Sequence, residues 1–97
     1  MPRYLVERSI PGAGQLTAGE LRAIVRQSLR AQQALEAEIQ WISSTFAGDR
    51  MVCFYIADDE DLVREHARLS GLPIERIWKI SAVFGPAMND LDWDDQA

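Results

Sequence analysis

The chain is predicted to fold as one α+β domain with the element order β-α-β-β-α-β. Three observations indicate this fold class: two amphipathic segments with helix-start signals, four short segments rich in β-favouring residues, and a hairpin signal between the middle two strands. A length of 97 residues suffices for one hydrophobic core and leaves no room for a second. Because so small a domain buries only about 60–65% of its unfolded surface, pairing with a second copy would stabilise it.

The first strand is predicted over 3–9, and a Pro- and Gly-containing segment follows it. Thr17 and Glu20 then have the spacing of a capping box, in which the hydroxyl accepts from the Glu20 amide and the carboxylate reaches back. Apolar residues recur at three- and four-residue spacing after this signal. The pattern predicts an amphipathic helix over 17–37 that packs on a sheet.

The second half of the chain continues the alternation of strands and helices. In order, we predict a strand over 39–46, a strand over 51–57, a helix over 58–70 and a strand over 77–84. A short turn at 48–50 joins the two middle strands as a hairpin, and Gly71 followed by Pro73 ends the second helix. Residues 1–86 are therefore expected to form the domain and 87–97 an acidic C-terminal tail.

This order is the split β-α-β pattern of the ferredoxin-like sandwich. Right-handed crossovers place both helices on one face of a four-stranded antiparallel sheet. The other face of the sheet is then uncovered in the monomer, which makes the residues on that face candidates for assembly or ligand binding.

The alternation of residues along each strand sorts them into a helix-facing set and an uncovered set. For the third strand, we predict that Val52, Phe54 and Ile56 meet the helices and that Met51, Cys53 and Tyr55 lie on the uncovered face. The corresponding helix-facing residues are Ile42 and Phe46 in the second strand, and Trp78, Ile80, Ala82 and Phe84 in the last. The first strand leaves two assignments open, with either Tyr4, Val6 and Arg8 or Leu5, Glu7 and Ser9 toward the helices.

On this assignment the uncovered face carries aromatic, Met and Cys side chains among small hydroxyls. Such a mixture is typical of the centres of protein interfaces. Two interpretations follow: a homodimer formed sheet to sheet, or paired faces that also enclose a small-molecule cavity. Trp41, Ser43 and Tyr55 are the predicted ligand-binding residues.

Net charge is −5, and acidic residues cluster at 58–61 and in the tail. Nucleic-acid binding requires clustered Lys and Arg, so we expect no nucleic-acid partner. No apolar run approaches the roughly 20 residues that cross a bilayer, so we expect no membrane role. The N-terminus lacks a signal-peptide pattern, and the cytoplasm is the expected location.

Three residues could carry chemistry. His66 is the only histidine and falls on the apolar stripe of the second helix, where it is a structural residue, a metal ligand or a general base. Cys53 is the only cysteine and is either a small core residue on a strand or a nucleophile, although no basic residue adjacent in sequence would activate it. Glu7 lies inside a strand, where a carboxylate needs a cation such as Arg8, Arg50 or Lys79, or a metal.

Several stretches resemble a family of small bacterial proteins named for a nickel-binding member. These stretches are Met1–Glu7 with Arg8, Ile39–Trp41, Cys53–Ala57 and Arg64–Pro73, with Glu65-His66-Ala67 before Gly71-Leu72-Pro73 as the best motif. The resemblance covers 1–86 and implies a ferredoxin-like dimer that binds a divalent metal such as nickel. It carries over His66, Cys53 and Glu7 as candidate metal ligands. With one histidine per chain, such a site would need ligands shared by two copies.

The leading functional hypothesis is therefore a small homodimeric protein that binds a small molecule or a divalent metal, without catalysis. The rival hypothesis is a cofactor-free enzyme of the monooxygenase or isomerase type, with His66 as the base in an apolar dimer cavity. Fold analogy alone does not distinguish the two.

Overall fold

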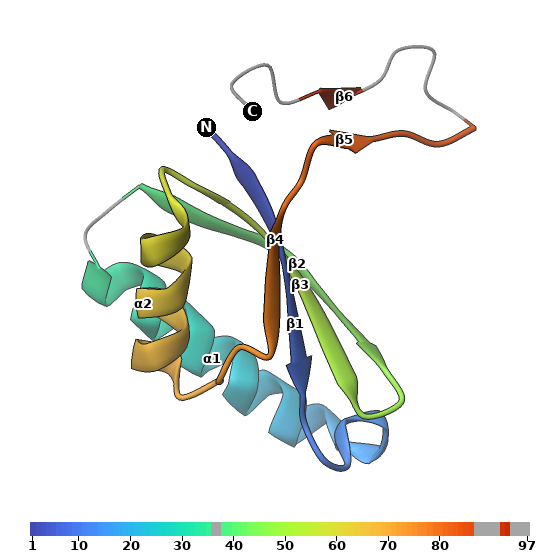
Figure 1. The fold of residues 1–97 in the computed structure, drawn as a ribbon. Helices are drawn as coiled ribbons and strands as arrows, with labels where there is room; N and C mark the ends of the chain where they lie inside the picture. Colours follow the sequence, from blue (N-terminus) through green and yellow to red (C-terminus); the bar gives the residue numbers. More distant parts are fainter. Residues whose placement is uncertain (36–37, 87–91, 94–97) are drawn as a thin grey trace.

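A computed structural model of the chain describes residues 1–35, 38–86 and 92–93. The elements follow the predicted order, with a short 3-10 helix and two short strands in addition (Figure 1). They are β1 Arg3–Ser9, η1 Ala13–Gln15, α1 Ala18–Leu35, β2 Ile39–Ala47, β3 Arg50–Ala57, α2 Glu60–Ser70, β4 Arg76–Lys79, β5 Ala82–Val83 and β6 Asp92–Trp93. The predicted tail, 87–97, lies outside the described residues apart from β6.

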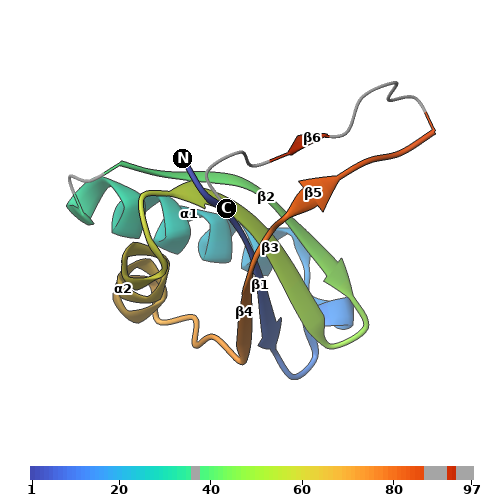
Figure 2. The same ribbon diagram turned by 45° about the horizontal axis from the view of Figure 1, so that its top comes forward.

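The main sheet has four antiparallel strands in the order β2-β3-β1-β4. Both helices lie against one face of this sheet, and Figure 2 shows the other face without a covering layer. The predicted ferredoxin-like α+β architecture is confirmed. We call the uncovered side of the four-stranded sheet the open face.

The ends of the helices are fixed by the residues that the sequence indicated. The Thr17 hydroxyl accepts from the Glu20 amide at 3.2 Å, and the Glu20 carboxylate accepts from the Thr17 amide at 3.1 Å. Asp59 caps α2 by accepting from the Leu62 amide at 3.0 Å. Gly71 ends α2 with a φ of 72°, a conformation that costs glycine little and other residues more.

The predicted faces of the third strand are wrong. Met51, Cys53, Tyr55 and Ala57 of β3 are buried against the helices, whereas Val52, Phe54 and Ile56 alternate with them toward the open face. In β1 the buried set is Tyr4, Val6 and Arg8, which resolves the alternative that the sequence left open. Both sets in β3 are largely apolar, so alternation alone did not separate them. The antiparallel register, in which Val6 pairs with Cys53, fixes which set lies beside the buried side of β1.

A β-bulge changes the faces of β2. The register with β3 shifts between Trp41 and Ser43, so Ile42 is an extra residue in the ladder. Trp41 packs against the core, whereas Ile42 is 50% exposed, the reverse of the prediction for both residues. Beyond the bulge the prediction holds: Phe46 packs against the core and Ser43 pairs with Phe54 on the open face.

The last predicted strand is also corrected, because β4 ends at Lys79 and β5 forms a separate two-stranded sheet with β6. Ile77 packs against the core, and Trp78 is 44% exposed. Phe84, predicted to face the helices, is 73% exposed. The chain therefore leaves the main sheet after residue 80, whose amide donates to the Arg3 carbonyl at 2.8 Å.

Candidate functional site

Between the sheet and the helices lies a group of buried polar side chains, which we call the interior polar cluster. It comprises the side chains of Arg8 of β1, partly buried Ser44 of β2, Cys53 and Tyr55 of β3 and His66 of α2, together with the backbone carbonyl of Ser28 of α1. Five elements distant in sequence thus meet at one place. Buried polar groups of this kind require partners, so the hydrogen bonds decide what the cluster can do.

Arg8 is fully buried, with 0% of the residue exposed. Its Nε donates to the Leu72 carbonyl at 3.0 Å and its Nη1 donates to Cys53 Sγ at 3.0 Å. The guanidinium carbon lies 5.9 Å from the centre of the Tyr55 ring, within the range of a cation–π contact. Nη2 has no partner among the described residues. No ion pair between Arg8 and a carboxylate is present in the described part of the chain.

Cys53 accepts a second hydrogen bond, from the Ser44 hydroxyl at 2.9 Å. The same hydroxyl accepts from Trp41 Nε1 at 2.8 Å, so Trp41, Ser44 and Cys53 form a short relay across β2 and β3. The bulge in β2 makes this possible, because it brings Trp41 and Ser44 to the same side of the sheet. The sulfur is therefore engaged by two donors inside the core.

His66 is 0% exposed and joins α2 to α1. Its Nε2 lies 2.9 Å from the Ser28 carbonyl, which identifies Nε2–H as the donor and leaves Nδ1 as an acceptor without a partner among the described residues. Burial lowers the pKa of His66, the Arg8 charge lowers it further, and the bond to Ser28 opposes both. Tyr55 packs edge-on against His66 at 5.2 Å, and burial raises the pKa of Tyr55 to about 12. Both rings are therefore uncharged at neutral pH.

The open face carries a different set of residues. Leu5 of β1 pairs with Phe54 on one side and with Trp78 on the other, so three large apolar side chains lie in a row across the sheet. Ile42 extends the apolar surface toward β2. No charged residue falls within this row, which is therefore the most apolar part of the open face.

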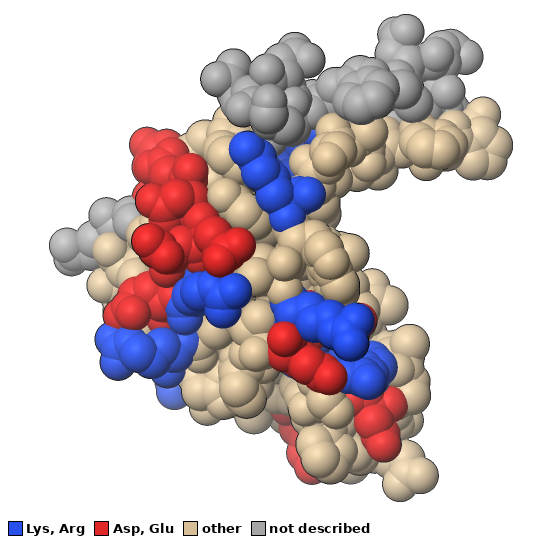
Figure 3. Space-filling model, viewed as in Figure 1, with Lys and Arg blue, Asp and Glu red and all other residues tan. Residues whose placement is uncertain are grey.

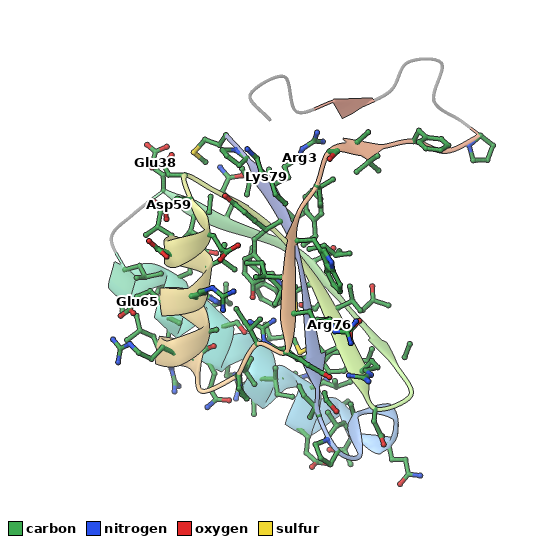
Figure 4. All side chains as sticks on the ribbon, viewed as in Figure 1. Arg3, Glu38, Asp59, Glu65, Arg76 and Lys79 are labelled. Carbon is green, nitrogen blue, oxygen red and sulfur yellow. The ribbon has the colours of Figure 1, made fainter. Side chains whose placement is uncertain are left out.

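At one end of the open face the side chains are charged. Arg50 Nη1 lies 3.5 Å from a Glu7 carboxylate oxygen and is also paired with Glu75. Arg76 pairs with Glu7 along the ladder, and Figure 4 shows it on the sheet side of the molecule, away from Glu65 on α2. A mixed rim of two carboxylates and two guanidinium groups therefore borders the apolar row.

The three candidate metal ligands do not come together. Cys53 and His66 both contact Tyr55 in the interior polar cluster, whereas Glu7 belongs to the opposite side of β1. In residues 1–35, 38–86 and 92–93, no three His, Cys, Asp or Glu side chains are arranged to hold a metal ion. The Arg8 guanidinium beside Cys53 Sγ would also repel a divalent cation there. Within the part of the chain that the structure describes, the interior polar cluster therefore offers no set of three such ligands.

The three candidate ligand-binding residues are divided in the same way. Tyr55 is 1% exposed in the core and Trp41 packs against it, so only Ser43 lies on the open face. A base at His66 would be separated by the sheet from a ligand bound on the open face.

Sequence reasoning missed Arg8 and Ser44 as members of the cluster. The sequence did place Arg8 in one of the two sets of β1 residues that could face the helices. No feature of the sequence indicated the bulge in β2 that turns Ser44 inward.

A shallow surface cavity of about 400 Å³ lies at the end of α2. It is lined by Arg64, Ala67, Arg68, Gly71, Pro73 and Ile74. Its two arginines already pair with carboxylates on α2, Arg64 with Glu60 and Arg68 with Glu65. The cavity therefore offers little uncompensated charge to an anionic ligand.

The fold and the open face define a small ferredoxin-like α+β protein. The model of the SCO4226-like family, described as nickel responsive protein SCO4226-like, matches residues 4–80, and the chain belongs to this family. No curated protein matches the chain. The crystal structure of SCO4226 from Streptomyces coelicolor A3(2) is similar in fold, with a TM-score of 0.67 at 11% identity over 80% of this chain and 94% of that one. In the described part of the chain, no helix is both long and apolar enough to cross a membrane.

Proposed function

We propose that the protein is a small homodimeric binding protein that assembles through the open face and holds a divalent metal or a small ligand between its two copies. The observation that carries this proposal is the apolar row of Leu5, Phe54 and Trp78 on a sheet face that no helix covers. Ile42 at 50% and Trp78 at 44% exposure are large side chains that a second copy would remove from water.

A two-fold symmetric dimer would cover this surface on both copies with a single interface. An isologous interface uses the same patch on both subunits, so one surface satisfies both copies and the assembly closes. The apolar row with a charged rim matches the usual anatomy of an interface, with an apolar centre and polar edge. The rim charges can also fix the relative orientation of the copies.

The family name supports nickel as the metal to test first. Of the three candidate ligands, only Glu7 lies where a second copy could add donors to it. A metal ion there would have to displace the exposed Arg50 guanidinium, which now pairs with both Glu7 and Glu75. We therefore propose that the Glu7 carboxylates of two copies contribute to a shared site, and that His66 and Cys53 serve the interior. The assignment agrees with the faces of the strands, since Glu7 of β1 lies on the open face and Cys53 of β3 lies in the core. It also lets two copies each supply a ligand, which one chain with a single histidine would require.

Native mass spectrometry of untagged protein prepared without chelator tests the assembly. The expected species is a dimer, and Ile42→Ser combined with Trp78→Ser should shift it to monomer at low micromolar concentration. Leu69→Ser on α2 is the matched control, because Leu69 is 41% exposed but distant from the open face. A wild-type monomer, or a double variant that remains fully dimeric, would contradict the proposed interface.

Titration with nickel chloride followed by mass spectrometry tests the ligand assignment. Glu7→Gln should lower the number of nickel ions bound per dimer, whereas His66→Gln should leave it unchanged. Glu65→Gln is the matched control for a carboxylate on the far side of the molecule. If His66→Gln abolishes binding in a folded protein while Glu7→Gln does not, the assignment to the open face is wrong.

A further inference from the structure

The main sheet has two edges, and only one of them is long. β4 forms one edge with four residues, and it begins with Arg76 and ends with Lys79, so that basic side chains lie at both of its ends in the space-filling view (Figure 3). β2 forms the other edge with nine residues. A long edge strand presents its outer amide and carbonyl groups to any other extended chain.

The side chains of β2 give its edge little protection. The sequence of the strand, IQWISSTFA, contains no charged residue and no proline, and these are the residues that commonly keep other strands away from an edge. Its aromatic, Ile and Thr side chains favour the pairing of extended chains. The features that keep this edge closed must therefore lie in the backbone of β2 or in a neighbouring element.

A side chain from α1 reaches the backbone of β2. Gln32 Oε1 accepts a hydrogen bond from the Trp41 amide at 3.1 Å, so this amide of the edge strand is bound by a helix side chain in place of another strand. Gln32 is half-buried, whereas Gln33 beside it is exposed. The contact lies immediately before the bulge, since the register with β3 shifts between Trp41 and Ser43.

We propose that Gln32 and the bulge at Ile42 together keep the edge of β2 closed to the β2 strand of a second copy. The bulge interrupts regular pairing after Trp41, and Gln32 occupies a donor in the regular part of the strand before it. The strand kept away is another β2, because two identical edges fit each other in an antiparallel two-fold pair. The inference is independent of the proposed homodimer, which uses the open face.

Amide hydrogen exchange in the full-length chain tests the contact. Gln32→Ala should speed exchange of the Trp41 amide about fivefold, as expected for the loss of one hydrogen bond of ordinary strength. The helix itself should persist, because alanine is the strongest helix former. Gln32→Glu keeps an acceptor oxygen and should retain the protection. Gln33→Ala is the matched control, since it changes the same residue type at an exposed neighbouring position and should leave the Trp41 amide unchanged.

Association separates a closed edge from a merely stabilising contact. In sedimentation velocity at rising concentration, Gln32→Ala should form species larger than those of the wild type, whereas Gln32→Glu and Gln33→Ala should not. In a mixture of ¹⁵N-labelled and ¹³C-labelled chains of the alanine variant, nuclear Overhauser effects should join β2 residues of two copies. Unchanged exchange at Trp41, faster exchange without larger species, or larger species joined elsewhere than at β2 would each overturn the proposal. Because the comparison is with the wild-type species, monomer or dimer, failure of the open-face dimer would leave this test intact.

Discussion

The guanidinium of Arg8 and the thiol of Cys53 are in hydrogen-bond contact at 3.0 Å, on neighbouring strands and entirely out of solvent. A second bond from Arg8 holds the Leu72 carbonyl just after α2, so one side chain ties β1, β3 and the end of α2 together. A buried guanidinium without a carboxylate depends on all of its acceptors. The interior polar cluster is therefore a structural element, and its loss should appear in stability.

Substitution of Cys53 tests this dependence. Cys53→Ala removes the acceptor of Arg8 and of Ser44 and leaves a small void, so we expect the free energy of unfolding to fall by roughly 2–3 kcal/mol. Cys53→Ser keeps an acceptor at the same position and should cost less. Urea unfolding of both variants gives the comparison, and an alanine variant as stable as the serine variant would show that the sulfur's hydrogen bonds contribute little.

The buried histidine predicts loss of stability in mild acid. Because the folded protein lowers the pKa of His66, the unfolded chain binds the proton more readily, and stability falls as pH drops through about 6.5 toward the folded pKa. Between pH 7.5 and 5.5 the free energy of unfolding should decrease. His66→Gln should remove most of this slope. Equal slopes in the two proteins would assign the effect to other groups.

Adjacent aromatic residues on β3 should respond in opposite ways to truncation. Tyr55 is 1% exposed in the core, so Tyr55→Ala should cost roughly 3–5 kcal/mol and leave little folded protein. Phe54 lies on the open face, so Phe54→Ala should retain the fold and chiefly weaken association. Circular dichroism with analytical ultracentrifugation separates the two effects. A stable Tyr55 variant beside an unfolded Phe54 variant would reverse the faces of β3.

The capping box at the start of α1 offers a local test. Thr17→Ala removes the acceptor for the Glu20 amide, and we expect a loss of about 1 kcal/mol in the free energy of unfolding. Thr17→Ser keeps a hydroxyl and should retain most of that stability. The measurement is thermal unfolding at matched concentration, since association would also raise the melting temperature. No difference between alanine and serine at this position would mean that the cap is dispensable.

The sequence predictions were correct for features set by residues close in sequence and wrong for features set by contacts between distant segments. β1 was predicted at its observed bounds, and the Thr17 cap and the Gly71 helix end were also correct, because each depends on residues close in sequence. The faces of β3 were predicted wrongly because Val52, Phe54 and Ile56 are at least as apolar as the residues that became buried. When the open face is also apolar, alternate residues of a strand no longer differ in polarity, and the pattern cannot show which set is buried.

For the candidate site, the sequence singled out His66, Cys53 and Glu7 but gave no means of placing them together. His66 and Cys53 meet near Tyr55 because α2 packs on β3, and Glu7 is excluded because it alternates with buried Val6 and Arg8. Arg8 became a member of the cluster through contacts with Cys53 and Leu72, which are far from it in the chain.

The amino-acid sequence was sufficient to predict the class of fold, the order of its main elements, the helix ends and an uncovered sheet face. These depend on local propensity, capping and chain direction, which short segments carry. Packing in three dimensions was needed to establish which side of β3 is buried, where β2 bulges, that the main sheet ends at β4 and that the interior polar cluster forms. Those features depend on strand register and on pairs of side chains that only packing brings together, and short-range patterns do not encode them.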